Sequence, residues 1–212
     1  MRRTRVPTRH SRVLLPMAML AAFACGMFRA ARADDAPPRG AAEQQAIAEI
    51  RGHGGSVMEL AQNDSRLVVA YHLADGEVID EKLAPLAKLT RVVELNLRGT
   101  EIGDDGLAHV AGLNTLVRLH LEKTKIGDAG LDHLKGLENL EYLNLYGTQI
   151  TDAGLARLAG MKKLKRLYVW ETPVTDAGIE RLKKSLPELA IIRGASLPAA
   201  ETKQEETKPD DQ

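Results

Sequence analysis

The chain has 212 residues, of which 44% are hydrophobic and 27% are charged, so it can bury the core of about one folded domain. Its formal charge is zero, but the charges are unevenly distributed, because residues 1–33 contain seven arginines and no acidic residue. The 29 basic residues less these seven leave 22 against 29 acidic residues after position 33. Such a chain lacks the concentrated basic field of nucleic-acid-binding proteins, and we expect no nucleic-acid partner.

Residues 1–33 have the layout of a secretory signal peptide. The basic start leads into an apolar run at 13–28, and Ala31-Arg32-Ala33 forms a small-residue cleavage site. The run is short for a bilayer span and contains Pro16. A retained anchor, which would then be the only link to a membrane, and a lipoprotein modified at Cys25 remain alternatives. We expect an exported protein, in the periplasm, at the cell surface or secreted.

Cys25 is the single cysteine, so a chain cut after Ala33 contains none. Disulfides, thiolate metal sites and a cysteine nucleophile are then excluded. The sequence next predicts a linker at 34–40 and an N-terminal cap at 41–67. In that cap, residues 41–51 have the pattern of an amphipathic helix, and the following residues predict a hairpin that leads into a sheet.

Four segments of the chain then align without gaps at one constant period. They are residues 92–106 (VVELNLRGTEIGDDG), 116–130 (LVRLHLEKTKIGDAG), 140–154 (LEYLNLYGTQITDAG) and 164–178 (LKRLYVWETPVTDAG). Alternating leucines predict a short strand in each unit, and a later spacing of three predicts a short helical turn. Each unit is therefore expected to be one coil of a right-handed α/β solenoid, with parallel strands on the concave face and short helices on the convex face.

The shared pattern, L-x-x-L-x-L-x-x-T-x-I-x-D-x-G-L, resembles the leucine-rich-repeat family. It is similar to the 24-residue variant of bacterial exported proteins that carries Thr or Cys where many members carry Asn. The resemblance covers residues 68–194, including a C-terminal cap, and implies a binding protein. Shifting back by one period from the first of the four segments predicts a degenerate first repeat with Val68, Tyr71 and Leu73 at inward positions. Residues 195–212 are polar and acidic, and we expect them to be disordered.

Two polar positions recur in every unit. The threonine position is expected to be structural, with hydroxyls that bond the backbone of the turns; its residues are Thr100, Thr124, Thr148 and Thr172. The aspartate position could suggest calcium, but one carboxylate per turn does not supply the converging oxygens that calcium needs. We expect each aspartate, with Thr151 or Thr175 beside it in two of the repeats, to cap the short helix that follows it; the aspartates are Asp104, Asp128, Asp152 and Asp176.

The outward strand positions offer no nucleophile for a Ser/His/Asp or Cys/His site, because they contain neither Ser nor Cys. His120 and Glu122 could suggest acid–base chemistry, but an open face would not exclude water. Opposite charges should pair across neighbouring strands, Glu94 with Arg118 and Arg98 with Glu122. The sequence therefore predicts no enzyme, no cofactor and no metal site.

Aromatic side chains gather on the outward positions of two consecutive strands. Tyr, Trp and Arg are the residue types enriched at binding hot spots. The candidate partner-binding residues are Tyr142, Tyr146, Arg166, Tyr168 and Trp170. The alternative is that Trp170 only covers the C-terminal cap and that the tyrosines only cover the sheet.

These observations favour an exported, non-catalytic binding module that acts as a monomer. It would recognise a protein or peptide through its concave face, with a glycan as a further option. The competing interpretation is an accessory or structural envelope protein associated with an exported enzyme.

Overall fold

The computed structural model describes residues 40–74 and 76–194. The predicted signal peptide, the predicted acidic tail and all of the predicted linker except Gly40 lie outside the described residues. Within these two ranges, no helix has the length and the apolar character that crossing a membrane would require.

Helices and strands alternate along most of the described chain. The first elements are α1 (Ala41–Gly52), β1 (Ser56–Ala61), β2 (Asp64–Ala70), the 3-10 helix η2 (Asp80–Lys88) and β3 (Val92–Asn96). The middle ones are η3 (Asp105–His109), β4 (Arg118–His120), η4 (Ala129–Leu134) and β5 (Tyr142–Asn144). The last are α2 (Asp152–Arg157), η5 (Leu158–Gly160), β6 (Arg166–Tyr168), α3 (Asp176–Ser185) and β7 (Ala190–Ile192).

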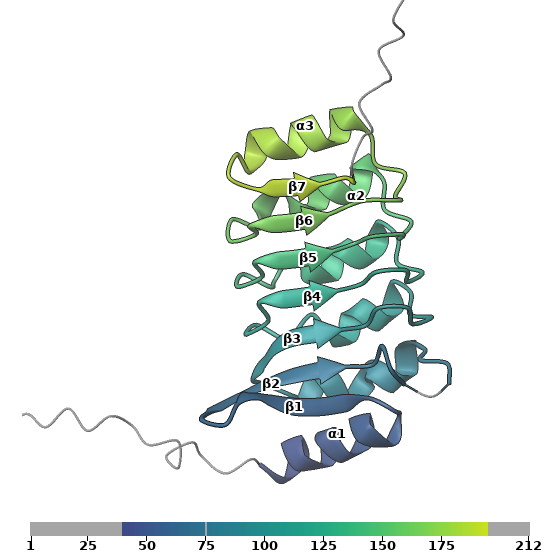
Figure 1. Cartoon of the computed structure of the whole chain (residues 1–212), viewed down its shortest axis with the longest axis vertical. Coiled ribbons are helices and arrows are strands. Elements are labelled where there is room, and N and C mark those ends of the chain that lie inside the picture. The colour runs from purple at the N-terminus through teal and green to yellow at the C-terminus, as the bar shows by residue number, and fades with distance from the viewer. Residues whose placement is uncertain (1–39, 75, 195–212) are drawn as a thin grey trace, which may run out of the picture. The chain divides into compact units, whose positions relative to one another are not determined.

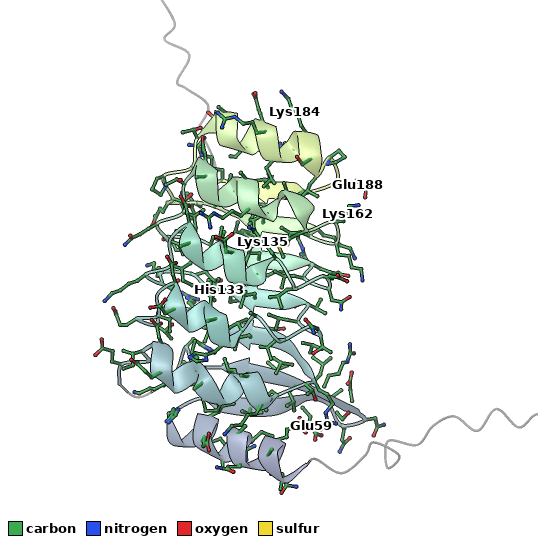
Figure 2. The ribbon with its side chains drawn as sticks, turned by 180° about the vertical axis from the view of Figure 1, so that it is seen from behind. Glu59, His133, Lys135, Lys162, Lys184 and Glu188 are labelled. Atoms are coloured by element: carbon green, nitrogen blue, oxygen red, sulfur yellow. The ribbon has the colours of Figure 1, made fainter. Side chains whose placement is uncertain are left out.

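The strands form one sheet in the order β1 to β7, antiparallel between β1 and β2 and parallel thereafter. The strands lie side by side in chain order in Figure 1, and the helices form a second layer, in front of the sheet in the reverse view of Figure 2. We call the sheet face that these helices leave uncovered the open face; it is the predicted concave face. The structure is the predicted α/β solenoid of short parallel strands backed by helices, including its helix and hairpin at the N-terminus.

The inward leucines form a continuous core between the two layers. Leu95, Leu119, Leu143 and Leu167 pair in register on β3 to β6, and each is fully buried. Their neighbours on either side along each strand face outward, as alternation requires. Each ladder joins equivalent positions of successive repeats, such as Glu94 and Arg118, because the repeats contain no insertions.

The first coil differs from the prediction. The repeat period places Tyr71 opposite Leu95, but Leu95 pairs with Val69. Val68 pairs with Glu94 on the open face, and Leu73 is 82% exposed, so neither is inward as predicted. Tyr71 is buried, as expected, and its hydroxyl donates to the Lys82 carbonyl at 3.2 Å. Because Val78 still lies one period before Ile102 and both are buried, the extra length lies in the turn after β2. A constant shift of one period therefore gives the wrong phase for β2.

The four repeated threonines bond their own coil. Each hydroxyl donates to the carbonyl three residues earlier, at 2.7 to 2.8 Å; the pairs are Thr100 with Leu97, Thr124 with Leu121, Thr148 with Leu145, and Thr172 with Val169. The role is structural, but these bonds close the turn after each strand rather than link successive coils.

The aspartates do not cap the helices that follow them, and that prediction was wrong. Neither Asp104 nor Asp128 makes a side-chain cap bond to its own 3-10 helix. Each carboxylate instead reaches the next coil and accepts a backbone N–H there, at 2.7 to 2.8 Å; the pairs are Asp80 with Gly103, Asp104 with Gly127, Asp128 with Thr151, and Asp152 with Thr175. Asp176 pairs with Arg193. The column thus joins coil to coil, and it includes Asp80, which the sequence did not single out.

The residue before each aspartate decides which helix follows. Thr151 and Thr175 accept the N–H of Ala153 and Gly178 at 3.2 Å, so α2 and α3 begin with a side-chain cap. The same hydroxyls donate at 2.6 Å to the aspartate of the preceding coil. Gly103 occupies this position in an earlier coil and has no hydroxyl, and the 3-10 helix η3 follows it. The prediction of threonine caps in these two coils was right.

The Asp152 junction should depend on pH. The hydrogen bonds from the Thr175 hydroxyl and backbone N–H hold the pKa of Asp152 below its ordinary value of 3.8. A lowered folded-state pKa stabilises the fold above the unfolded-state pKa, and this contribution is lost as the pH falls through the folded-state value. Asp152→Asn should therefore lower the melting temperature at neutral pH, by an amount that shrinks between about pH 5 and about pH 2.

Thermal melts followed by circular dichroism across this pH range measure the difference. Asp105→Asn is the matched control, because Asp105 is exposed and follows a coil-joining aspartate without being one. A difference between Asp152→Asn and wild type that stays constant down to low pH would contradict the assignment.

Candidate functional site

The strand register arranges the open face in rows of side chains. One row contains Met58, Val68, Glu94, Arg118, Tyr142, Arg166 and Ala190. The next contains Ser56, Ala70, Asn96, His120, Asn144, Tyr168 and Ile192. A third row, given by the repeat period two residues further along each coil, contains Arg98, Glu122, Tyr146 and Trp170. The face is therefore apolar at β2, charged at β3 and β4, and aromatic at β5 and β6.

The structure brings the predicted aromatic residues together on β5, β6 and the turns that follow. The Tyr142 and Tyr168 ring centroids lie 5.3 Å apart, and those of Tyr146 and Trp170 lie 5.4 Å apart, both in tilted arrangements. Such offset contacts are favourable for aromatic pairs. We call Tyr142, Tyr146, Tyr168 and Trp170 the aromatic patch.

Trp170 is both exposed and partly covered. Its exposed fraction is 54%, the largest among the four residues of the patch, since the three tyrosines are half-buried. A Cβ added to Gly194 would lie 2.7 Å from the indole, so the backbone after β7 packs against one side of the ring. Trp170 therefore lies against the backbone that follows β7, in line with the alternative interpretation, and still presents an apolar surface to solvent.

Three cations lie over the rings of the patch. The guanidinium carbons of Arg118 and Arg166 are 5.2 and 5.6 Å from the Tyr142 centroid, and Lys123 Nζ is 5.5 Å from that of Tyr146. These distances fall within the range of cation–π attraction. The sequence pattern singled out Arg166 but not Lys123, because Lys123 reaches Tyr146 from the neighbouring coil.

Two residues beside Tyr146 have a left-handed backbone. Lys123 has φ 54° and Glu171 has φ 53°, and in the described part of the chain no other non-glycine residue has a positive φ. Two other coils place Gly99 and Gly147 at this position, where a Cβ costs conformational energy. Strained residues that persist in a fold often serve function. Here the two strained positions place one positive side chain, Lys123, and one negative side chain, Glu171, beside the patch.

The carboxylates of the face are engaged within it. Glu94 lies 3.5 Å from Arg118 Nε and 3.7 Å from His120 Nε2. Buried Glu122 contacts His120 Nδ1 at 3.1 Å and accepts from Asn144 Nδ2 at 2.6 Å. The predicted Glu94–Arg118 pair is present, whereas no Arg98–Glu122 ion pair is found among the described residues. Glu122 turns instead toward His120 and Asn144, which shield it from water.

Two tyrosines of the patch favour their neutral form. Burial raises the pKa of Tyr142, and a hydrogen bond with Glu171 is the main cause that raises the pKa of Tyr146. Both hydroxyls therefore remain protonated at neutral pH. Across residues 40–74 and 76–194, no three His, Cys, Asp or Glu side chains are grouped so that they could hold a metal ion.

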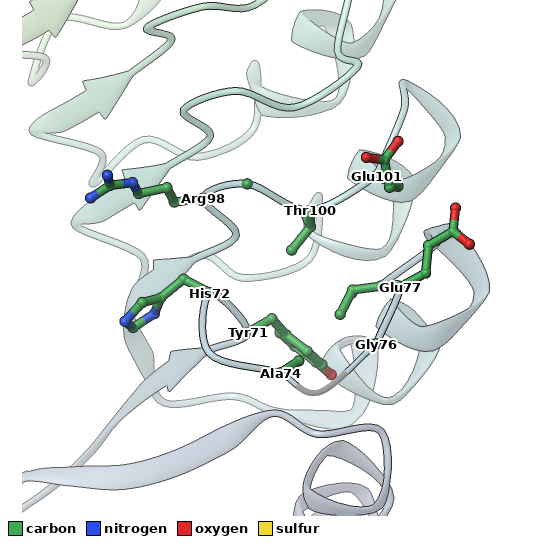
Figure 3. A pocket seen from close by; sticks show the side chains of 10 residues that line it. Tyr71, His72, Ala74, Gly76, Glu77, Arg98, Thr100 and Glu101 are labelled. Atoms are coloured by element: carbon green, nitrogen blue, oxygen red, sulfur yellow. The ribbon is translucent and has the colours of Figure 1, made fainter.

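A separate pocket of about 340 Å³ opens beside the longer first turn. Its lining includes Tyr71, His72, Glu77, Arg98 and Glu101, shown in Figure 3. His72 and Arg98 lie toward one side of the pocket, and Glu77 and Glu101 toward the other. It lies where the first coil departs from the repeat, at the opposite end of the sheet from the aromatic patch.

Comparison with known proteins assigns part of the chain to a repeat family. Residues 89–111, 112–134 and 136–159 each match the family model described as Leucine Rich repeat. No curated protein matches the chain.

Several solved structures are similar. Internalin C2 from Listeria monocytogenes has 26% identity over 62% of this chain and 66% of its own, with a TM-score of 0.42. A second Listeria internalin, inlF, has 22% identity over 53% of this chain and 37% of its own, with a TM-score of 0.39. The chain thus spans less than two thirds of either internalin.

The leucine-rich-repeat ectodomain of the receptor kinase SOBIR1 from Arabidopsis thaliana has 13% identity over 73% of this chain and 92% of its own, with a TM-score of 0.46. The three consecutive family matches, stacked coil on coil along one parallel sheet, identify residues 89–159 as leucine-rich repeats within a leucine-rich-repeat solenoid.

Proposed function

We propose that this chain is an exported, non-catalytic, monomeric binding module that recognises a protein or peptide through the open face. Export rests on the sequence of residues 1–33, and the repeats are proposed to be of the 24-residue threonine type. The aromatic patch, together with Arg166, is the proposed contact surface. One observation carries the proposal. Trp170 remains 54% exposed although it packs within the only cluster of outward-facing tyrosines on the described sheet.

The composition of the patch supports this role. Tyrosine and tryptophan bury large apolar area at low entropic cost, and they are enriched where binding energy concentrates. The rings also contact one another, so they are partly ordered before a partner binds. Such preorganisation lowers the entropic cost of association.

The size of the face limits the binding mode. Seven strands span six intervals, or about 29 Å at a spacing of about 4.8 Å. With three rows of side chains, this area is smaller than the roughly 800 Å² per partner of a standard interface. The partner should therefore also contact the turns beside the patch, where Lys123 and Glu171 lie, or bind weakly.

Replacing Tyr168 and Trp170 by alanine should weaken partner binding by about 2 kcal/mol or more, a factor of roughly 30, and leave the fold intact. The expectation follows from the loss of two ring contacts and of the exposed indole. The partner would first be isolated from envelope extract of the native host by the full chain. Calorimetric titration with the purified partner then measures the change in Kd.

The matched control is Glu138→Ala with Lys162→Ala, two exposed residues that line one pocket whose lining includes no residue of the open face. Equal affinities for wild type, control and double variant would contradict the proposal and favour a structural or accessory role. Because Trp170 is the only tryptophan, its emission gives an independent reading. A bound partner should shift that emission to the blue.

A further inference from the structure

We infer that the partner presents an acidic, extended peptide segment, whose carboxylates bind the cations over the aromatic patch while its apolar side chains cover the rings. The inference rests on the proposed function and specifies the chemistry of the partner. Its starting point is the contrast between the patch and the chain around it. After residue 33 the chain is net acidic, with 22 basic against 29 acidic residues, yet cations lie over two rings of the patch.

The charges of these cations are not neutralised equally. Arg118 has Glu94 as a partner at 3.5 Å, whereas Arg166 and Lys123 make no ion pair with any described residue. Two nearby carboxylates are engaged elsewhere, since Glu94 lies beside Arg118 and His120, and Glu122 faces His120 and Asn144. Arg166 and Lys123 are themselves exposed, so their charged groups are accessible to an incoming ligand.

The strained backbone of Lys123 supports the same conclusion. Two neighbouring coils place glycine at this position, and glycine would remove the strain there. A lysine at φ 54° makes the fold less stable than a glycine would, but it places an ammonium group above the Tyr146 ring. Glu171 has the same strained backbone and the opposite charge, so the strain marks this edge of the patch for binding, and the cations without ion pairs indicate an anionic ligand.

The spacing of the cations fits an extended chain. Arg118 and Arg166 lie on β4 and β6 with Tyr142 between them, about 9.6 Å apart at the ordinary strand spacing. A polyproline II segment repeats its side-chain direction every three residues, or about 9.3 Å, and such segments commonly dock on aromatic surfaces. Acidic residues three positions apart could therefore meet both guanidiniums, with an apolar residue over Tyr142.

Charge and exposure favour a peptide over other polyanions. A nucleic acid would need a larger basic field than three cations on a net acidic chain provide. Exposed Trp170 and, at the far end of the face, Met58 offer apolar surface that peptide side chains can bury. A sulfated glycan shares the anionic chemistry and is distinguished by the test.

The test uses the full chain and a fluorescein-labelled peptide with the sequence Glu-Pro-Pro repeated three times, followed by fluorescence anisotropy. The matched probe replaces every Glu by Gln. The Glu peptide should bind at least about tenfold more tightly at about 50 mM salt, and about 500 mM salt should remove most of the difference because screening weakens exposed charge pairs. Equal binding of the two peptides would overturn the inference.

The variants Arg166→Gln and Lys123→Gly should each weaken binding of the Glu peptide several-fold, and together by at least about tenfold. Lys123→Gly should be at least as stable as wild type, so its effect cannot come from unfolding. The charge-matched control is Lys162→Gln with Lys183→Gln, two exposed lysines away from the open face, and it should bind as wild type does. Equal losses in the control and in the test variants would contradict a local site.

Two further outcomes separate this inference from the proposed function. If the isolated partner loses affinity with Tyr168→Ala and Trp170→Ala but not with Arg166→Gln and Lys123→Gly, the binding module stands and the acidic-peptide inference is overturned. If a sulfated oligosaccharide binds more tightly than the Glu peptide and depends on the same two cations, the peptide assignment is overturned in favour of a glycan.

Discussion

Leu143→Ala should lower the free energy of unfolding by about 2 to 5 kcal/mol, the range observed for buried leucines replaced by alanine. Leu143 is fully buried in the middle of the sheet and pairs with Leu119 on one side and Leu167 on the other. The cavity cannot close easily, because the neighbouring coils are fixed at the strand spacing. Since each coil depends on its neighbours, the loss should appear in the melting of the whole domain.

Chemical denaturation followed by circular dichroism measures this loss. Glu138→Ala is the control, an exposed residue whose replacement should change the free energy of unfolding by less than about 0.5 kcal/mol. Asn144 would be a poor control, because it bonds both Glu122 and the backbone of Tyr146. A loss in Leu143→Ala no larger than in Glu138→Ala would mean that the inward and outward faces of the strands are wrongly assigned.

Gly154→Ala should be comparably destabilising, by about 2 to 5 kcal/mol, although it adds only one methyl group. The new Cβ would overlap Asp128 Oδ1 and lie 2.9 Å from Ile150 Cγ2. The carboxylate would have to leave its place and give up its bonds to the Thr151 backbone at 2.8 Å and hydroxyl at 2.6 Å. Overpacking and the loss of charge-assisted hydrogen bonds would then act together.

A double-mutant cycle identifies the cause. Once Asp128→Ala has removed the carboxylate, adding Gly154→Ala should cost much less than it does in the wild type, because the closest clash is absent. Gly112→Ala is the control, since nothing lies within 4 Å of its added Cβ. Additive losses from Asp128→Ala and Gly154→Ala would show that the carboxylate does not explain the need for glycine.

The repeat period predicted most of the sheet because the coils contain no insertions. It correctly places Tyr142 beside Arg166 and Asn144 beside Tyr168. It fails in the first coil, where the turn after β2 is longer and a uniform shift assigns exposed Leu73 to the core. The length of one turn cannot be read from the period of the other repeats. The residue type leucine does not by itself show whether the side chain is buried or exposed.

Side-chain direction was harder to predict than strand register. A column of aspartates at equal spacing shows that they occupy equivalent places, but not whether each carboxylate bonds its own coil or the next. The glycine two positions after each aspartate was the available signal, because it leaves room for a carboxylate arriving from the preceding coil. Likewise, Glu122 could turn toward Arg98 or toward Asn144, and only the packing of His120 decides between them.

The junction formed by an aspartate and the glycine of the next coil repeats the same backbone N–H bond at every step from Asp80 to Gly178, and the last two steps add a threonine hydroxyl bond. A gene duplication that copied one whole coil would therefore create two junctions whose donors and acceptors already match. A copy that began or ended elsewhere would set a carboxylate against a larger side chain. The solenoid can thus lengthen or shorten during evolution in units of one coil, and each such step would add or remove one strand of the open face while the ends of the domain stay unchanged.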